Sequence, residues 1–423
     1  MAATTTDSAH TPAQSKSPPR AVVVMVVLLF IFFLGTSDNS MISPLLPLIA
    51  AEVGLEVGRV GSMILPAYAI AAAAASLVIG PVSDRLGRRK FLLYASVIFG
   101  LSLLAAMLIK DARVLIATRV LTGLAAGTFS TCSIAYVADY FPYEKRGVAM
   151  SVVQAGYFLA LVVGVPVATH LAAWRNSYRP SFAFFASLSA LAFVIVLALL
   201  PDDGREVAAR NASATPTRRF NNIRMSFEGR ERIAAIAAAF CVTGGFVGFF
   251  SYLGAWLKDT IHLSTTQIGY FFPVVGVALV IGAFVAGPVS DTFGKRGLSI
   301  MSTLALAAML FVIPRFGWGL ALIASFLTAS LAFAFRQGPL QALATELVPS
   351  NARGAFVAVR NTASQIGFAV STGVSGYLYD HGGYEAVGLF GAALTLGAAV
   401  CIFLIREPAQ RTIRVDVDPG RDR

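Results

Sequence analysis

The chain has 423 residues, of which 57% are hydrophobic and only 13% charged, and its mean hydropathy is +0.73. Soluble domains carry about 25% charged residues, so this composition excludes an ordinary soluble fold. The formal net charge of +11 would suggest nucleic acid in a soluble protein, and the placement of the basic residues decides whether that holds.

Residues 1–20 are rich in Ala, Thr, Ser and Pro and predict a disordered tail. A helix that spans a bilayer needs about 20 apolar residues, and such stretches follow in two series. The first lies near 21–45, 60–80, 91–109, 114–138, 148–171 and 181–200. The second lies near 233–257, 267–288, 298–314, 319–344, 355–378 and 386–405. The sequence therefore predicts an all-α integral membrane protein with twelve transmembrane helices.

A polar segment over 201–232, with seven arginines and five acidic residues, separates a first half (21–200) from a second half (233–405), and residues 406–423 form a second tail. If both termini are cytoplasmic, 23 of the 33 Lys and Arg lie in cytoplasmic segments, seven in the opposite loops and three inside helices. Basic residues accumulate on the cytoplasmic side. We therefore expect a multi-pass protein of the inner (cytoplasmic) membrane, embedded in the lipid bilayer with both termini cytoplasmic and without a nucleic-acid partner.

The residues that carry enzymatic or metal chemistry are scattered. Cys132, Cys241 and Cys401 stand in separate apolar stretches, and the four histidines are isolated. The sequence has no Gly-x-Ser-x-Gly element, and no phosphate-binding Gly-x-x-x-x-Gly-Lys-Ser/Thr loop occurs. We expect no enzyme activity, no metal site and no cofactor.

An internal repeat is the most informative feature of the sequence. Residues 80–84, Gly-Pro-Val-Ser-Asp, recur 207 positions later as residues 287–291. The same register also pairs Gly87 with Gly294, Arg89 with Arg296, Pro66 with Pro273, Pro142 with Pro349, and Asp139 with Glu346. A constant register over about 90 residues predicts two pseudo-symmetric six-helix bundles, as in transporters built from parallel repeats.

Residues 80–90, Gly-Pro-Val-Ser-Asp-Arg-Leu-Gly-Arg-Arg-Lys, resemble the signature of the major facilitator superfamily between helices 2 and 3. The weaker copy, which ends at Gly294-Lys295-Arg296, falls between helices 8 and 9, where that family has its second copy. The resemblance implies a small-molecule transporter that works by alternating access, with these loops as gating elements. The implied gating residues are Gly80, Asp84, Arg85, Gly87, Arg88, Gly287, Asp291 and Gly294.

Ionisable side chains inside a membrane are costly and mark functional sites. Asp38 is the only carboxylate well inside a predicted helix. From a rise of about 1.5 Å per residue, Asp38 and Arg119 fall at a similar depth in the outer half of the membrane. Burial disfavours a charged carboxylate and a neighbouring guanidinium favours it, so Asp38 beside Arg119 could bind and release a proton.

The resemblance adds that helices 1 and 4 line the central cavity. Residues 119–123, Arg-Val-Leu-Thr-Gly, followed by Gly127, resemble a helix-4 motif linked to proton transfer. We therefore expect Asp38 and Arg119 to couple transport to protons. The alternative is a structural Asp38 that only pairs with Arg119 or bonds to unwound backbone near Pro44 and Pro47.

Arg336 lies about 15 Å from the cytoplasmic edge of its helix, and the resemblance places helix 10 at the cavity. We expect Arg336 and the adjacent Gln337 to contact the substrate. The alternative is that Arg336 binds a carbonyl or Asp38 across the cavity. Arg360 is expected to reach the interface. Three cations against one anion favour an anionic or neutral polar substrate over a cationic one.

Gly156, Gly164 and Pro166 resemble the helix-5 signature of efflux members, although Val165 interrupts its Gly-Pro pair. Trp174-Arg175 and Phe182 resemble the outer loop of the bacterial drug and sugar efflux group. We expect a monomeric secondary transporter of a small organic solute that works by proton-coupled efflux (antiport). Three alternatives stay open: proton-coupled uptake (symport) of an organic anion, passive facilitation, and a non-transporting receptor or assembly protein on the same scaffold.

Overall fold

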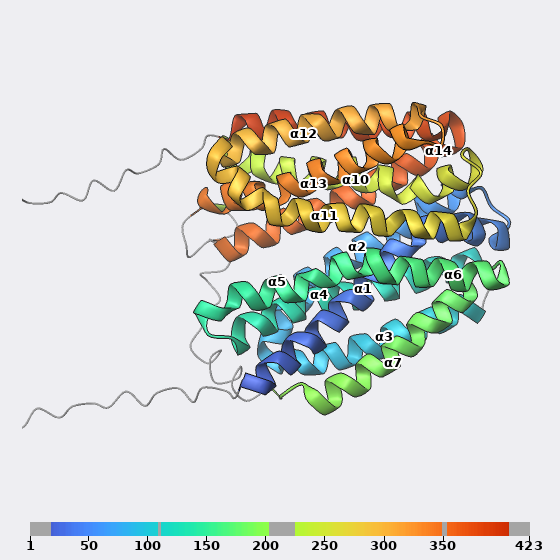
Figure 1. Ribbon diagram of the computed structural model, residues 1–423. Coiled ribbons are helices and arrows are strands. Elements are labelled where there is room, and N and C mark those ends of the chain that lie inside the picture. Colours follow the sequence, from blue (N-terminus) through green and yellow to red (C-terminus); the bar gives the residue numbers. More distant parts are fainter. Residues whose placement is uncertain (1–17, 109–110, 203–224, 349–352, 406–423) are drawn as a thin grey trace, which may run out of the picture.

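The computed structural model describes residues 18–108, 111–202, 225–348 and 353–405, and these are helical with short connections and no strand. The first bundle comprises α1 (Pro18–Val53), α2 (Val57–Leu86), α3 (Arg88–Leu108), α4 (Ala112–Tyr140), α5 (Tyr143–Leu159), η1 (Ala160–Gly164), α6 (Val165–Arg175) and α7 (Arg179–Leu199). The second comprises α10 (Arg230–Asp259), α11 (Thr265–Phe293), α12 (Lys295–Val312), η2 (Ile313–Arg315), α13 (Leu320–Glu346) and α14 (Arg353–Leu404). The two bundles lie side by side (Figure 1).

Eleven helical stretches of the described residues are long and apolar enough to cross a membrane. The last of them, α14, has 52 residues and would measure about 78 Å as one straight helix, more than twice the hydrocarbon core of a bilayer. Gly383, with φ 66° and ψ −171°, breaks its helical geometry. Because α14 thus contains two crossings, the prediction of twelve transmembrane helices is confirmed.

The helices extend beyond their predicted bounds. Helix α1 already begins at Pro18 and continues to Val53 with Pro44 and Pro47 inside it. The suggestion of unwound backbone near these prolines is therefore wrong. Residues 1–17, most of the connector predicted at 201–232, and the tail at 406–423 lie outside the described part of the chain.

The repeat is visible as matched interactions in the two bundles. Arg88 Nη1 lies 2.6 Å from Asp139 Oδ2, and 207 positions later Lys295 Nζ lies 2.5 Å from Glu346 Oε1. Each ion pair joins the start of the third helix of its half to the end of the fourth. A salt bridge reproduced at the same offset shows that the two halves share side-chain contacts as well as topology.

A second pair of matched contacts involves the next arginine of each repeat. Arg89 Nη2 donates to the carbonyl oxygen of Leu197 at 2.6 Å, and Arg296 Nη2 donates to that of Phe403 at 2.5 Å. These carbonyls lie in the last turns of α7 and α14, where backbone acceptors lack helical partners. The signature arginines therefore bind the end of the sixth helix in each half.

Glycine residues of the signature turn the chain between helices. Gly87 (φ 92°) ends α2 and Gly294 (φ 77°) ends α11. Residues with a Cβ atom rarely adopt such positive φ angles. The repeated glycines thus allow an immediate start of α3 and α12.

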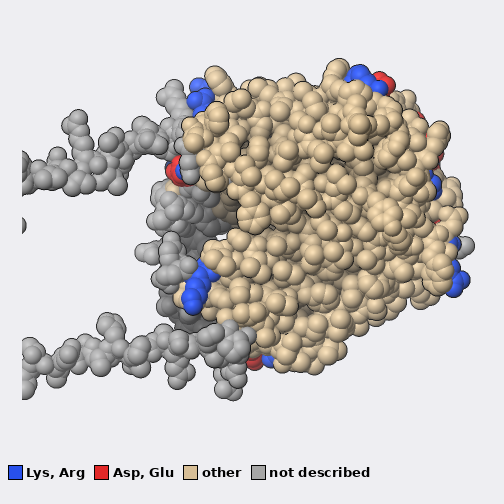
Figure 2. Space-filling model, viewed as in Figure 1, with Lys and Arg blue, Asp and Glu red and all other residues tan. Residues whose placement is uncertain are grey.

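Charged residues gather towards the two ends of the molecule, and an uncharged band lies between them (Figure 2). This is the surface expected of a chain whose middle contacts lipid. The start of α1 and the end of α14 lie at the same end (Figure 1). We call this the open end, and we call the opposite end, where α2 and α11 begin, the closed end.

The two halves contact each other toward the closed end. Ser43 Oγ donates to the Phe250 carbonyl at 2.8 Å, the Gly58 N–H donates to Asp380 Oδ1 at 2.7 Å, and His170 Nε2 lies 2.9 Å from Tyr270 Oη. At the open end the surface is hollowed between the halves (Figure 2). The molecule is therefore closed on one side and open on the other.

Candidate functional site

Asp38 of α1 and Arg119 of α4 form a buried ion pair. Arg119 Nη1 lies 3.1 Å from Asp38 Oδ2 and 3.2 Å from Oδ1. Asp38 is 0% exposed and Arg119 is 1% exposed. The guanidinium carbon also lies 5.2 Å from the centre of the Phe182 ring. The pair is therefore electrically balanced and sealed from solvent.

Small residues bring the helices of this pair together. A Cβ on Gly123 would overlap the Tyr68 carbonyl, and one on Gly127 would overlap the Ala72 carbonyl. The glycines that follow Arg119 thus let α4 pack directly against α2. Tyr68 in turn donates to the Gly35 carbonyl of α1 at 3.5 Å, so α2 bridges the two helices that carry the ion pair.

The fifth membrane-crossing helix, which consists of α5, η1 and α6 and is called helix 5 below, packs against α1 next to Asp38. A Cβ on Gly156 would lie 2.8 Å from the Phe33 nitrogen, and one on Gly164 would overlap Ser37 Oγ. The stretch Ala160–Gly164 (η1) is a π-helical turn, and such turns are frequent at functional sites. It precedes Pro166, whose missing N–H disturbs a regular helix. Ser37 Oγ is itself buried without a hydrogen-bond partner among the described residues.

Arg336 of α13 is fully enclosed, with 0% exposure. None of its three nitrogens has a hydrogen-bond partner within the described ranges, and no described acid pairs with it. Its guanidinium carbon lies 5.1 Å from the centre of the Phe333 ring. Asp38 does not serve as its partner, because that carboxylate is held by Arg119.

The difference between the two arginines is energetic. Removing one ion from water costs several kcal/mol, and a buried partner with good geometry offsets most of it. Arg119 has that compensation from Asp38. Arg336 has only the face of an aromatic ring, and such a contact contributes about 2 kcal/mol when desolvated. The buried charge of Arg336 is thus not neutralised by a protein group, and an anion bound to the guanidinium would offset its desolvation cost.

Gln337 and Arg360 differ from Arg336 in exposure and in their partners. Gln337 is exposed, because consecutive residues of a helix point about 100° apart. Arg360, expected to reach the interface, is half-buried and its Nη1 donates to Gln341 Oε1 at 2.7 Å. It therefore has a protein partner.

Of the residues expected to gate the transporter, Gly87, Arg88 and Gly294 take part in the turns and ion pairs described above. Gly80 makes an ordinary contact, since a Cβ there would lie 3.5 Å from Thr131 Cγ2. The surroundings of Gly287 and the side chains of Asp84, Arg85 and Asp291 lie outside the described part of the structure.

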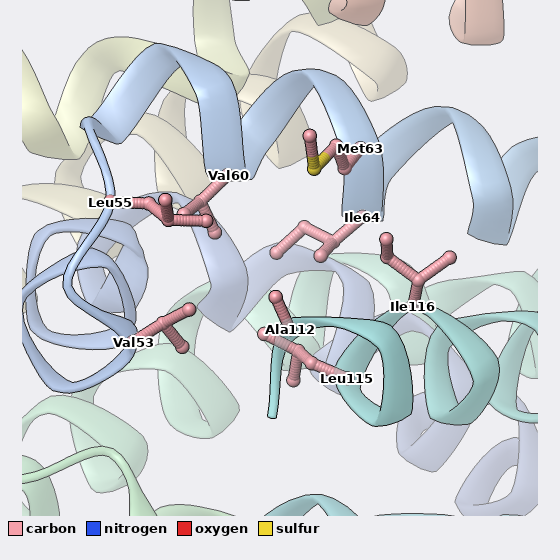
Figure 3. A pocket seen from close by; sticks show the side chains of 8 residues that line it. All are labelled: Val53, Leu55, Val60, Met63, Ile64, Ala112, Leu115 and Ile116. Atoms are coloured by element: carbon pink, nitrogen blue, oxygen red, sulfur yellow. The ribbon is translucent and has the colours of Figure 1, made fainter. Parts of the chain in front are cut away.

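A small apolar pocket lies at the closed end between the end of α1 and the starts of α2 and α4 (Figure 3). Its lining is apolar: Val53, Leu55, Val60, Met63, Ile64, Ala112, Leu115 and Ile116. Leu115 precedes Arg119 by one helical turn on the same side of α4. The eight lining residues offer no polar side chain to a solute. In the described residues, no group of three or more His, Cys, Asp or Glu could hold a metal.

Two aromatic neighbours of the charged residues were not assigned a role from the sequence. Phe182 covers Arg119 and Phe333 covers Arg336. Phe333 stands three residues before Arg336, a spacing that brings side chains together on a helix. The contact between these two residues could therefore have been predicted from the sequence. Phe182 is on α7, and its resemblance to the outer loop of the efflux group did not connect it with Arg119.

The sequence profile of the Major Facilitator Superfamily matches residues 28–372 and residues 238–419. The chain is similar to the uncharacterized MFS-type transporter YceJ of Bacillus subtilis, with 26% identity over 90% of this chain and 94% of that protein. It is 25% identical to the inner membrane transport protein YdhP of Escherichia coli, over 91% and 96% of the two chains. The solved D-xylose-proton symporter has the same fold, with a TM-score of 0.75 at 20% identity over 91% of this chain and 98% of that one. The expectation that the chain is not an enzyme is confirmed, and the chain belongs to the Major Facilitator Superfamily of membrane transporters.

Proposed function

We propose that this protein is a proton-coupled secondary transporter of a small organic anion, and that it exports this solute by antiport. The observation that carries the proposal is the fully buried Arg336 without a hydrogen-bond partner among the described residues. A buried cation without an anion is strongly disfavoured. A substrate anion that binds there supplies the missing charge, which favours an anionic over a neutral polar solute.

Asp38 and Arg119 are the proposed proton-coupling pair. Protonation of Asp38 removes its negative charge and weakens the 3.1 Å contact that ties α1 to α4. Loss of the proton restores the contact. Because α1 also meets the second half through Ser43 and Phe250, a change at Asp38 can reach the contact between the halves. Alternating access by rocking of the halves is the motion expected of this fold.

The proposed orientation follows from the distribution of basic residues. With both termini in the cytoplasm of a cell whose inner membrane holds the protein, the open end faces inward. The repeated ion pairs Arg88–Asp139 and Lys295–Glu346 lie at that end. We infer that these signature loops gate the cytoplasmic side, and that Gly80, Asp84, Gly287 and Asp291 belong to the same gate.

We infer efflux rather than uptake from the resemblance of Gly156, Gly164 and Pro166 to the helix-5 signature of efflux members. Gly164 lies against Ser37, next to Asp38, so this helix contacts the neighbourhood of the coupling pair. The second candidate is proton-coupled uptake of the same anion, which the buried Arg336 supports equally.

Proteoliposomes can test both the substrate class and the direction. Vesicles are loaded with labelled citrate, benzenesulfonate or glucose, and exit is followed after the outside is acidified. Antiport predicts faster anion exit than without a gradient, and symport predicts slower exit. Arg336→Gln should abolish the flux, whereas Arg360→Gln, which removes an arginine with a protein partner, should retain it. Transport of glucose alone, or anion flux unchanged in Arg336→Gln, would contradict the proposal.

A further inference from the structure

The surroundings of Arg336 point to one class of anion, and this inference rests on the proposed function. We propose that the substrate is a monoanion with an aromatic ring, such as an aromatic carboxylate or sulfonate. The guanidinium binds the anionic group, and a row of phenylalanines from three helices receives the ring. We call Phe333, Phe246, Phe250 and Phe272 the aromatic row.

The aromatic row is continuous from Arg336. Phe333 lies under the guanidinium at 5.1 Å, and its ring centre is 4.1 Å from that of Phe246. Phe246 stacks with Phe250 at 5.4 Å and an interplanar angle of 19°. Phe250 meets Phe272 edge-on at 5.2 Å. The two separations made by Phe250 are those of favourable aromatic contacts, and Phe333 packs on Phe246 more closely still. A planar ligand ring fits such a row better than a branched aliphatic body.

The row reaches the boundary between the two halves. The carbonyl oxygen of Phe250 accepts the hydrogen bond from Ser43 of α1, so one end of the row lies where α10 contacts the first half. Phe250 and Phe333 are only partly buried, which leaves ring surface for a ligand. Solutes bind near the midplane between the repeats in this type of fold.

Two hydroxyl groups of α13, the helix that carries Arg336, donate to carbonyls of their own helix. On α13, Thr328 Oγ1 donates to the Ala324 carbonyl at 2.9 Å, and Ser330 Oγ donates to the Phe326 carbonyl at 2.7 Å. On α10, Thr243 is the only hydroxyl residue between Phe240 and Phe250. A sugar needs several convergent hydrogen bonds, whereas an aromatic anion needs one charged partner and apolar walls.

The repeat shows that the cation is specific to the second half. At the 207-residue offset, Arg336 corresponds to Phe129 and Arg119 corresponds to Phe326, and both phenylalanines are buried. The first half therefore holds a balanced ion pair where the second has an apolar residue. In the described part of the second half, Arg336 is the fully buried positive charge without a carboxylate partner, and one negative charge on the substrate would balance it.

Access to the guanidinium requires movement, because Arg336 is fully enclosed. The Phe333 ring covers the guanidinium and is itself only partly buried. Turning of this ring would expose the guanidinium nitrogens to a carboxylate, which arginine binds with two parallel hydrogen bonds. The site thus opens for its ligand and closes without it.

Binding to the purified full-length protein tests the ligand class. Calorimetry compares benzoate with cyclohexanecarboxylate, acetate and benzyl alcohol. We expect benzoate to bind at least about tenfold more tightly than the other two anions, and benzyl alcohol not to bind. Phe250→Leu and Phe333→Leu should each weaken benzoate about three- to tenfold without weakening acetate. Phe284→Leu, a control at an exposed position of α11, should change nothing.

The outcomes separate this inference from the proposed function. If cyclohexanecarboxylate or acetate binds as well as benzoate, and Arg336→Gln abolishes that binding, the anion site stands and its aromatic preference is wrong. If no anion binds, or if Arg336→Gln leaves benzoate binding intact, the proposed function fails as well. If either row variant does not fold, the ligand series on the unmodified protein still decides the preference.

Discussion

Asp380 Oδ1 accepts a hydrogen bond from the backbone N–H of Gly58 at 2.7 Å, so that a carboxylate of the second half caps the first turn of α2 in the first half. Glu56, the local N-cap residue of α2, makes no side-chain capping bond. The equivalent helix α11 caps itself through Ser264 and Gln267. A negative charge at a helix N-terminus is stabilising, and this one acts only while the closed end stays closed.

Asp380→Ala should therefore weaken the closed end. Loss of a capping acceptor costs about 1 kcal/mol, which corresponds to about a fivefold change in population. Spin labels at Val148 and Thr292, both exposed toward the open end, report the change as a larger fraction of short distances. Glu385→Ala removes another exposed acid near the closed end and is the control. An unchanged distance distribution in Asp380→Ala would exclude the capping role.

The pairing partners inside the membrane could be anticipated from the sequence, because helix rise converts residue number into depth. Asp38 and Arg119 were expected at a similar depth in the membrane, and Asp38 Oδ2 lies 3.1 Å from Arg119 Nη1. The adjacent Gln337 shows the limit of this reasoning. Depth fixes how far a residue lies along a helix, but rotation decides what it faces, and Gln337 is exposed while Arg336 is buried.

Contacts between distant segments had no local signal. Gly58 and Asp380 are 322 positions apart, and no periodicity links them. The π-helical turn at Ala160–Gly164 lies where η1 packs on α1, and in the sequence only Gly164 and Pro166 indicated an irregular helix there. The repeat could be found because equivalent positions of the two halves hold identical or chemically similar residues, as Arg88–Asp139 and Lys295–Glu346 show.

Asp38→Asn should abolish gradient-driven transport and retain substrate binding. Asparagine keeps an oxygen for Arg119 but cannot exchange a proton, so substrate exchange without a gradient should continue. The variant also leaves Arg119 buried without a counter-ion, a change that costs about 3–5 kcal/mol. Asp38→Asn combined with Arg119→Gln removes both charges and should recover stability without recovering coupling. Full gradient-driven transport by either protein would rule out Asp38 as the coupling group.

Gly164→Ala should impair transport by displacing Ser37. A Cβ at this position would overlap Ser37 Oγ and lie 2.9 Å from Ser37 Cβ, so α1 must shift next to Asp38. Ser37→Gly removes both contacting atoms, and we expect the double variant to regain activity that Gly164→Ala loses. Gly147→Ala on α5, where a Cβ meets nothing within 4 Å, is the matched control. Equal activity of Gly164→Ala and Gly147→Ala would show that this close approach has no functional role.

Arg336→Met should make the substrate-free protein more stable and unable to bind its anion. Replacing a buried charge that has no partner with an apolar side chain of similar length removes a desolvation penalty, and we expect a gain of about 1–4 kcal/mol. Arg119→Met should do the opposite, because it leaves Asp38 buried without its counter-ion. Thermal unfolding of both variants in detergent, without added ligand, measures the contrast. Since a residue that destabilises the empty protein is retained only for its function, a loss of stability in Arg336→Met would mean that the guanidinium has a structural partner and that the anion site lies elsewhere.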